Sequence, residues 1–432
     1  MAVTMKSYQT ARGTRDILPS EQKYWNFLRR QAEEVFESLG ILRIDLPHFE
    51  NAEIFTRGIG TDTDIVQKEM YFVESKSKED ADAYALRPEG TAGAVRSYIQ
   101  NGMGSLPQPV KLYYMGSMFR HDRPQKGRFR EFMQIGVEIF GDPTPKSDYL
   151  CIMSAWEIFK RIGLKDLVVY MNSIGCPKCR PKYTTKLKKY YKDNLKKLCE
   201  TCQVRYEGNP LRLLDCKEEV CQKYAAGAPN ILDNLCPDCR SHFQSVLEYL
   251  DYFNIKYDLD PKLVRGLDYY SNTVFEIAEV SDTKRSGSLG GGGRYNGLVE
   301  LLGGPKTSAV GYALGMDRIV SLMKEKGVQT PTPKGVEISI LQLGEKAKEA
   351  SKKVYDLLTA AGINVFFVPS NDTLRGQIKG AVKLGSKFAV IIGQTEAMKD
   401  DFILRDLVAG AQETIPVKFV VEEVKKRLYG VV

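Results

Sequence analysis

The segment Lys111–Gly141 reads KLYYMGSMFRHDRPQKGRFREFMQIGVEIFG and predicts a β-hairpin with a strongly basic loop. The runs Leu112–Met118 and Phe132–Phe140 are rich in aromatic and β-branched residues, as antiparallel strands are. Arg120 then lies at the end of the first strand, where its planar guanidinium can hold a phosphate or a carboxylate through two hydrogen bonds. Three more arginines follow within the hairpin: Arg123, Arg128 and Arg130.

The second strand distinguishes this hairpin from an ordinary basic loop. An isolated run of charges is more often a solvated surface than a binding site. Gln134 and Glu138, however, are four residues apart and therefore share a face of the strand. Gly136 lies between them on the same face and leaves room beside them. The hairpin therefore predicts a nucleotide site.

Two other segments carry groups that a charged substrate needs. RPEGTA, residues 87–92, is a turn that brings Glu89 and Thr91 together as acceptors for an ammonium group. GYALGMDR, residues 311–318, predicts a strand that leads into a helix with Arg318 in its first turn. An arginine there adds to the helix dipole, which already favours anions. Alone, each pattern is equally well explained as a turn or as a charge at a helix end.

A fourth segment, residues 264–276, reads VRGLDYYSNTVFE. Arg265 precedes the tyrosine pair Tyr269 and Tyr270, and a β-type run follows. By itself this pattern is equally typical of a pair of core tyrosines. The four segments together are far more specific than any one of them.

These segments resemble the motifs of class II aminoacyl-tRNA synthetases, over nearly the whole chain. The second motif resembles FRHDRPQKGRFREFMQIGVEIFG (119–141), and the third resembles GYALGMDRI (311–319). RIDLPHFE (43–50) is similar to the first motif, which builds the dimer interface in this class. LVRGLDYYSNTVFEI (263–277) and GGGRYNGLVELLG (291–303) resemble the histidine signatures of the histidyl-tRNA synthetase family.

The resemblance implies an α+β fold, with a class II antiparallel sheet flanked by helices, an inserted cysteine-rich domain and a C-terminal α/β anticodon-binding domain. The implied catalytic domain is 1–327, interrupted by an insertion domain at approximately 172–250. A linker, 328–334, then leads to the anticodon-binding domain, 335–432.

The resemblance also implies a function: ATP-dependent activation of L-histidine to histidyl-adenylate, and transfer to the 3′ end of tRNA(His) by a homodimer. Arg120 and Arg265 would hold the α-phosphate and the carboxylate, and Arg318 would hold the γ-phosphate. Mg²⁺ would accompany the ATP. The remaining implied sites are Glu89, Thr91 and Gln134 for the α-ammonium, Glu138, Tyr269 and Tyr270 for the imidazole, and Arg123 and Gln125 for the acceptor end of tRNA.

Composition agrees with an enzyme that binds a polyanion. The chain has 432 residues, 43% of them hydrophobic, which is enough for two or three domains with cores. Its net charge of +8 favours an anionic macromolecular partner. The absence of an apolar run of membrane-spanning length and of a secretory N-terminus predicts a cytoplasmic protein without a membrane partner. Only three histidines occur, so arginine and glutamate are expected to carry the chemistry.

Residues 175–250 carry most of the excess charge, with 14 Lys or Arg against 9 Asp or Glu, a net charge of 14 − 9 = +5. We predict a helix over Tyr183–Leu198 with tyrosines and leucines on one face and lysines elsewhere. A solvated face is the simpler interpretation. Binding to the tRNA backbone is favoured by a modest margin, because lysines release counterions when they contact phosphates.

Eight of the nine cysteines lie in this insertion, three of the four pairs being CxxC. This spacing favours thiolate ligation of zinc over disulfides in a cytosolic protein. The synthetase family does not as a rule need a metal here, and buried reduced cysteines are common. One or two four-thiolate sites and no metal therefore both stay open, and the sequence does not say which pairs share an ion. The cysteines are Cys176, Cys179, Cys199, Cys202, Cys216, Cys221, Cys236 and Cys239, and Cys151 is expected in the core.

After the proline-containing linker, the pattern becomes β-α-β-α-β. EISILQL, INVFFVP and KFAVIIG predict the strands of a mainly parallel sheet, with helices over Ala347–Ala361 and Leu374–Leu384. Val421–Leu428 predicts a final short helix. No glycine-rich phosphate loop follows the first strand, so a Rossmann cofactor domain is not expected.

Two rival interpretations belong to other functional classes. The first is a regulatory paralogue in histidine biosynthesis without aminoacylation activity, which should lack parts of the ATP site and the C-terminal domain. The second is a zinc-ribbon RNA-binding protein whose active part is the cysteine segment. This second interpretation leaves the histidine signatures unexplained.

Overall fold

The computed structural model describes residues 8–60, 63–74, 83–122, 127–282, 287–331, 336–367 and 373–430. The chain divides into two compact units, Met1–Thr330 and Pro331–Val432, and the expected linker spans the division. Each unit has its own hydrophobic core. Within the described residues, no helix has the length and apolar character needed to cross a membrane.

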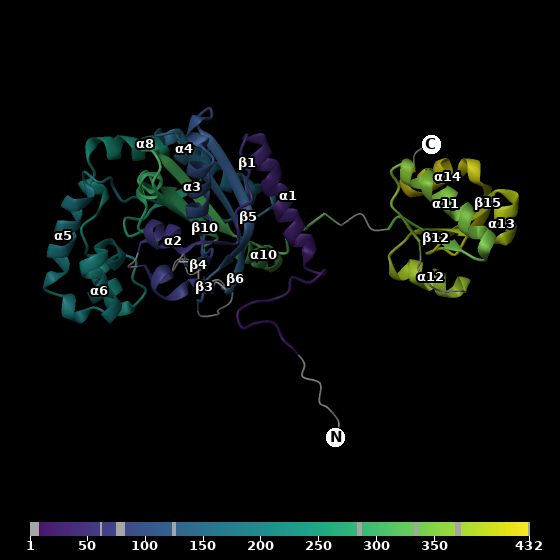
Figure 1. The fold of residues 1–432 in the computed structure, drawn as a ribbon, viewed down its shortest axis with the longest axis horizontal. Helices are drawn as coiled ribbons and strands as arrows, with labels where there is room; N and C mark the ends of the chain where they lie inside the picture. Colours follow the sequence, from purple (N-terminus) through teal and green to yellow (C-terminus); the bar gives the residue numbers. More distant parts are fainter. Residues whose placement is uncertain are drawn as a thin grey trace, which may run out of the picture. The chain divides into compact units, whose positions relative to one another are not determined.

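The first unit is built on an eight-stranded sheet (Figure 1). Its pairings are antiparallel except at the two edges, where β1 lies parallel to β5 and β8 lies parallel to β7. The predicted hairpin is confirmed as β5 and β6. In order across the sheet, the strands are β1 (Leu42–Arg43), β5 (Val110–Phe119), β6 (Glu131–Phe140), β11 (Ala309–Gly315), β10 (Gly290–Arg294), β9 (Ser271–Glu279), β7 (Leu167–Ser173) and β8 (Tyr257–Leu259).

Alternation along the strands gives the sheet two different faces. On β6, Ile135, Val137 and Ile139 point to one face and pack against helices in a hydrophobic core. Gln134 and Glu138 point to the opposite face, as predicted. The helices that cover the apolar face are α1 (Gln22–Ser38), α4 (Pro145–Arg161), α8 (Pro237–Tyr252) and α10 (Met316–Glu325).

Smaller elements surround the opposite face. A three-stranded sheet and three helices share one hydrophobic core with the insertion. Since these elements pack around the polar side of β6 and not across it, they leave a cavity there. The elements are α2 (Ala52–Ile59), α3 (Thr91–Gln100), α9 (Leu298–Leu301), β2 (Phe49–Asn51), β4 (Tyr84–Leu86) and β3 (Tyr71–Val73).

The insertion lies between β7 and α8 and contains α5 (Arg180–Lys192), α6 (Glu200–Gly208) and α7 (Glu219–Ala226). Figure 1 shows α5 and α6, in teal, at one end of the unit. The prediction of one helix to Leu198 was wrong, because α5 ends at Lys192 and a separate 3₁₀ turn follows. Asp193 and Asn194 stand at the break, and both residue types favour local hydrogen bonds over helix continuation.

The second unit has a five-stranded sheet. The predicted β-α-β-α-β core is confirmed, with β12 (Ile338–Gln342) parallel to both β13 (Val365–Phe367) and β14 (Phe388–Ile392). The sequence prediction missed two antiparallel strands, β15 (Asp401–Asp406) and β16 (Gln412–Pro416), because polar residues make up half or more of each. The helices are α11 (Glu345–Ala360), α12 (Leu374–Lys383), α13 (Gln394–Lys399) and α14 (Val420–Tyr429).

A buried ion pair joins the sheet of the first unit to its helices. Arg294, at the end of β10, is 1% exposed and Asp148 in α4 is 0% exposed. The Nε atom of Arg294 lies 3.1 Å from the Oδ2 atom of Asp148, and His242 of α8 lies 3.1 Å from the same oxygen. Burial alone would raise the pKa of Asp148, but Arg294 and His242 hold it below its usual value.

We expect Asp148→Asn to destabilise the first unit by about 3 to 5 kcal/mol at neutral pH, because it leaves the Arg294 guanidinium buried without a counter-charge. Urea unfolding followed by tryptophan fluorescence measures this selectively, since both tryptophans, Trp25 and Trp156, lie in this unit.

Asp356→Asn, which breaks an exposed ion pair in the second unit, serves as the control and should leave the fluorescence midpoint unchanged. Because the pKa of Asp148 is lower in the folded state than its ordinary value of 3.8, the ionised carboxylate stabilises the fold fully above about pH 3.8. This stabilisation is lost as the pH falls through the lowered pKa. The difference between wild type and the Asn variant should therefore shrink in acid. A loss below 1 kcal/mol at pH 7 would contradict the role of the pair.

Candidate active site

A cavity of about 1530 Å³ lies over the polar face of the sheet. The hairpin β5–β6, the strands β9 to β11, the start of α10 and the insertion all contribute to its lining. Eight of the residues expected to bind histidine or ATP line it: Glu89, Thr91, Arg120, Gln134, Arg265, Tyr269, Tyr270 and Arg318. Glu138 lies directly behind the lining, where Thr91 contacts it.

Glycines form the floor of this cavity. Gly136 of β6 and Gly291 of β10 lie on either side of Ala313 of β11 in one cross-strand row. A Cβ atom on Gly291 would lie 2.9 Å from the Nη1 atom of Arg265, and one on Gly293 would lie 3.0 Å from the ring of Tyr270. The missing side chains therefore let Arg265 and Tyr270 lie close over the sheet.

Glu138 is fully buried and accepts hydrogen bonds from three hydroxyl groups. Thr91 donates at 2.8 Å, Tyr114 donates at 3.1 Å, and Tyr295 also donates. Burial raises the pKa of Glu138 to about 8, although these hydrogen bonds act in the opposite direction. The carboxyl group can therefore gain or lose a proton near neutral pH.

Glu89 stands immediately before helix α3 and is 4% exposed. Its two carboxylate oxygens accept the backbone N–H groups of Thr91 and Ala92, at 2.7 and 2.8 Å. The RPEGTA turn thus brings Glu89 and Thr91 together as predicted. Burial raises the pKa of Glu89. Each oxygen keeps a further lone pair that can accept a bond from a ligand.

Six arginines line the cavity, and three of them, Arg120, Arg265 and Arg318, are those that the sequence singled out for substrate binding. Arg120 donates from Nε to the carbonyl oxygen of Pro88 at 2.8 Å, and this bond does not use its terminal nitrogens. Arg318, in the first turn of α10 as predicted, donates to the carbonyl oxygen of Ser288 at 2.6 Å. Arg265 lies over the ring of Tyr270 at 5.8 Å. Such a set favours ligands with several negative charges.

Three buried polar atoms of the cavity lining have no hydrogen-bond partner within the described part of the chain. They are the Oε1 atom of Gln134 and the Nε atoms of Arg265 and Arg212. A buried polar atom is rarely left unsatisfied in a folded protein. One acceptor and two donors are thus ready for a bound ligand.

Sequence reasoning missed three residues of this site. Tyr114 and Tyr295 hold Glu138, and Glu276 lies in the lining with an oxygen 3.9 Å from the Nη1 atom of Arg265. Tyr114 lies opposite Gly136 in the hairpin, so strand alternation could have placed it beside Glu138. Arg123 and Gln125, the candidates for the tRNA acceptor end, lie outside the described residues.

The insertion closes one side of the cavity. Arg205 of α6 forms an ion pair with Asp64 at 2.8 Å, and Asn209 donates to Asp268 at 2.5 Å. Arg212 donates to the carbonyl oxygen of Gly266 at 3.4 Å. These contacts hold the insertion against the segment that carries Arg265.

The cysteines of the insertion gather into two groups of four. Sulfur atoms of each group lie within 4.8 Å of one another. The base cluster is Cys176, Cys179, Cys236 and Cys239, and the wall cluster is Cys199, Cys202, Cys216 and Cys221. Cys151 is fully buried in the core, as predicted.

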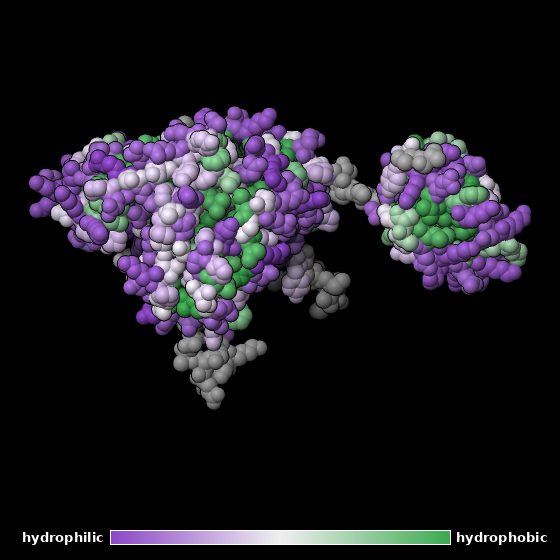
Figure 2. Space-filling model, turned by 90° about the horizontal axis from the view of Figure 1, so that it is seen from above, coloured by the Kyte–Doolittle hydropathy of each residue, from purple (hydrophilic) through white to green (hydrophobic). Residues whose placement is uncertain are grey.

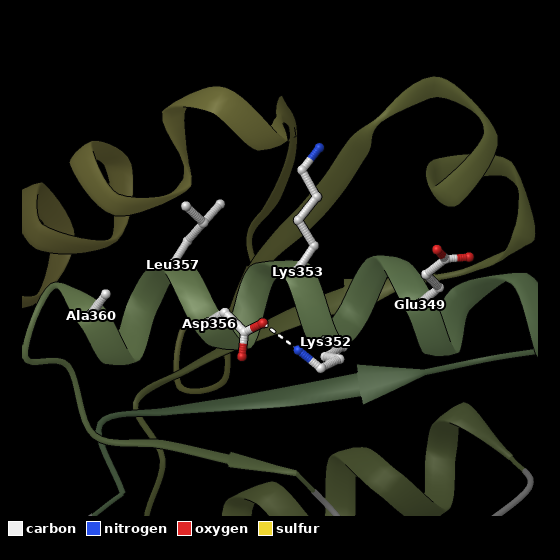
Figure 3. Close-up of a pocket in the computed structure, with 6 residues that line it drawn as sticks. All are labelled: Glu349, Lys352, Lys353, Asp356, Leu357 and Ala360. Atoms are coloured by element: carbon white, nitrogen blue, oxygen red, sulfur yellow. Dashed lines mark hydrogen bonds and ion pairs between the residues drawn. The ribbon is translucent and has the colours of Figure 1, made fainter.

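A second hollow, of about 410 Å³, lies on the surface of the second unit. Figure 3 shows that all its lining side chains project from α11, with an ion pair between Lys352 and Asp356. Exposed charges on one helix are typical of a solvated surface. The residues that the sequence predicts to bind substrates line the cavity of the first unit and not this hollow.

Comparisons with known proteins match both units of the chain. The family model described as "Histidyl-tRNA synthetase" matches residues 13–179 and 180–319. The model described as "Anticodon binding domain" matches residues 337–427 in the second unit.

Two similar relatives, each named "Histidine--tRNA ligase", come from Desulforamulus reducens and Acetivibrio thermocellus. The first is 45% identical over 416 residues, covering 96% of this chain and 98% of the relative. The second is 44% identical over 418 residues, covering 96% and 99%. The crystal structure of apo S. aureus histidyl-tRNA synthetase superposes with a TM-score of 0.80 at 33% identity, covering 97% of this chain and 100% of that one. The chain therefore belongs to the histidyl-tRNA synthetase family.

Proposed function

We propose that this chain activates L-histidine with ATP to form histidyl-adenylate and then transfers the histidyl group to the 3′ end of tRNA(His). The observation that carries the proposal is that one cavity is lined by Arg120, Arg265, Arg318 and Glu89, with Glu138 directly behind the lining. Such a cavity has positive charge for phosphates and hydrogen-bond acceptors for an amino acid.

The amino acid would lie over the glycine floor. Its α-ammonium group would donate to Glu89, Thr91 and the unpartnered Oε1 atom of Gln134. Arg265 would hold its carboxylate, using the buried Nε atom that has no partner in the described chain. Both unsatisfied atoms would then be paired, which removes the free-energy cost of their burial.

The imidazole ring would lie toward Glu138, framed by Tyr269 and Tyr270. The centroids of these two tyrosine rings are 4.7 Å apart, and Tyr269 also packs edge-on against Tyr295. The carboxyl group of Glu138 would accept a hydrogen bond from a ring N–H. Amino acids that lack this donor would leave Glu138 unpaired, which is a strong basis for selection.

ATP would lie along the arginines. The carboxylate oxygen of histidine attacks the α-phosphorus, and the bond to pyrophosphate breaks. Arg120 and Arg265 would stabilise the charge that builds on the α-phosphate, and Arg318 would hold the γ-phosphate. Mg²⁺ would accompany the β- and γ-phosphates, and the Glu276 carboxylate in the lining is the type of oxygen ligand that it prefers.

Transfer RNA would then contact several parts of the chain. Arg123 and Gln125 are our candidates for its acceptor end, and α5 offers exposed lysines such as Lys186 and Lys189 for its backbone. The proposed domains are a catalytic domain over 1–327, interrupted at about 172–250, and an anticodon-binding domain over 335–432.

The rival functions explain less of the chain. A regulatory paralogue should lack parts of the ATP site, yet Arg120 and Arg318 both line the cavity. It should also lack the C-terminal domain, and residues 337–427 match the anticodon-binding family. An RNA-binding zinc ribbon would give no role to the buried Glu138 pocket.

The central test is exchange of pyrophosphate into ATP, which should require L-histidine. Arg120→Ala should lower this exchange by at least about a hundredfold, because it removes charge stabilisation from the α-phosphate. Arg30→Ala is the matched control, since that arginine is 80% exposed on α1 and should leave exchange unchanged. Near-normal exchange by a folded Arg120→Ala protein would reject the assigned role, and histidine-independent exchange would reject the function.

Glu138→Gln should lower kcat/KM for histidine by about tenfold to a hundredfold, because a charge-assisted hydrogen bond contributes about 1.5 to 3 kcal/mol. The KM for ATP should change little. Separate Michaelis constants for the two substrates measure this.

Thermal unfolding at several pH values is the control for Glu138→Gln. Between pH 4.5 and about 8, Glu138 ionises more readily in the unfolded chain than in the folded one, so the stability of the wild type falls as the pH rises. A glutamine does not ionise and has no such loss. The stability of the variant relative to wild type should therefore improve with rising pH. Equal losses for histidine and ATP, with a lower melting temperature at every pH, would indicate a structural role only.

We further propose a homodimer that acts in the cytoplasm. Leu42 and Phe49 flank the Pro47 segment and are 67% and 56% exposed. Figure 2 shows hydrophobic side chains collected in a band on one face of the first unit. Apolar surface of this kind is typical of a subunit interface. Light scattering should give twice the chain mass, 48.7 kDa, for the active species, and an active monomer would contradict the proposal.

A further inference from the structure

The two cysteine clusters have the geometry of tetrahedral metal sites. In the base cluster, the sulfur of Cys176 lies 3.8 Å from that of Cys179 and 3.9 Å from that of Cys236. In the wall cluster, the sulfurs of Cys199 and Cys216 are 3.8 Å apart. Four sulfurs at about 2.3 Å from a zinc ion lie about 3.8 Å from one another, so the two sets of distances agree.

These distances do not suit disulfides. A disulfide joins sulfurs at about 2.05 Å, whereas all nine cysteines of this chain are free. Four thiolates packed this closely repel one another unless a cation lies between them. The spacing of the sulfur atoms in both clusters therefore favours a bound metal ion over disulfide bonds.

Donors already point at the sulfurs. The backbone N–H of Cys176 donates to the sulfur of Cys179 at 3.3 Å, and that of Cys199 donates to the sulfur of Cys221 at 3.3 Å. The side-chain amide of Asn272 donates to the sulfur of Cys239, also at 3.3 Å. Donors of this kind orient metal-bound thiolates and stabilise their charge.

The base cluster joins the two ends of the insertion. Cys176 and Cys179 come directly after β7, and Cys236 and Cys239 lie at the start of α8, so one ion would fasten the segment between them. Arg180 follows in the chain and donates to the carbonyl oxygen of Tyr270 at 2.6 Å. Its positive charge also offsets the net negative charge of four thiolates around one divalent cation.

The wall cluster lies beside the active-site cavity. Cys199 and Cys216 contribute to the cavity lining itself. The segment between them contains α6 and the residues Arg205, Asn209 and Arg212, which hold the insertion against the catalytic part. An ion in this cluster would fix that segment at both ends.

We propose that the chain binds two zinc ions, one in each cluster, and that they hold the insertion as a rigid wall of the cavity. One ion would be bound by Cys176, Cys179, Cys236 and Cys239, and the other by Cys199, Cys202, Cys216 and Cys221. Neither ion takes part in the reaction, because a four-thiolate site leaves no open coordination position.

Elemental analysis of the purified full chain, before and after incubation with ZnCl₂ under reducing conditions, tests the proposal. We expect two zinc ions per chain. The double variants Cys176→Ser/Cys236→Ser and Cys199→Ser/Cys216→Ser should each retain one. Cys151→Ala, which removes the one cysteine outside the clusters, is the matched control and should retain two.

Two measurements on the wild-type chain keep the test decisive if a variant fails to fold. Co²⁺ exchanged for zinc should show the visible and charge-transfer bands of tetrahedral thiolate coordination for two ions per chain. Chelation should speed tryptic cleavage within residues 180–235 by roughly tenfold, because the fastened segments then open locally. Fewer than two ions per chain, iron in place of zinc, or unchanged cleavage after chelation would overturn the proposal. None of these readouts depends on histidine activation.

Discussion

The middle of the central sheet has to be free of side chains on its cavity face. Gly136, Gly291 and Gly293 meet this constraint, since a Cβ atom at any of them would collide with Tyr114, Arg265 or Tyr270. Glycines weaken a strand, because they add conformational entropy to the unfolded chain and pack nothing. The sheet tolerates them because its other face is a continuous apolar core under four helices. The buried pair of Arg294 and Asp148 further ties the glycine-rich strand β10 to those helices.

The cavity keeps its charged groups in place with neutral partners. Three hydroxyl groups hold Glu138, and two backbone amides hold Glu89. Arg120 and Arg318 are fixed through carbonyl oxygens. Since these partners carry no net charge, they position the side chains without neutralising them. The side chains therefore remain available for the ammonium, carboxylate and phosphate groups of the proposed substrates.

The insertion links the cysteines to the same cavity. Its helices bury tyrosines against the catalytic core, and its polar contacts reach the segment that carries Arg265. An element with few strands and many charged residues has little apolar surface with which to fix its own shape. The proposed zinc ions in the base cluster and the wall cluster would add rigidity to this element.

The sequence by itself determined the hairpin, the strand and helix that carry Arg318, and the residue types of the site. These depend on local patterns, namely alternation along β6, the turn at residues 87–92 and the basic run that begins at Arg120. It also predicted the parallel core of the second unit, but it missed β15 and β16, where polar residues conceal the strand pattern.

Tertiary structure alone decided the contacts between distant segments. Tyr295 meets Glu138 only because β6, β11 and β10 lie side by side in the sheet. The cysteine pairing could not be read from spacing, since each CxxC pair can turn toward any other. Only the tertiary structure brings the start of α8 to the start of α5, and so Cys239 to Cys179. The sequence shows which residue types a site can use, but contacts between residues far apart in the sequence depend on how the helices and strands pack.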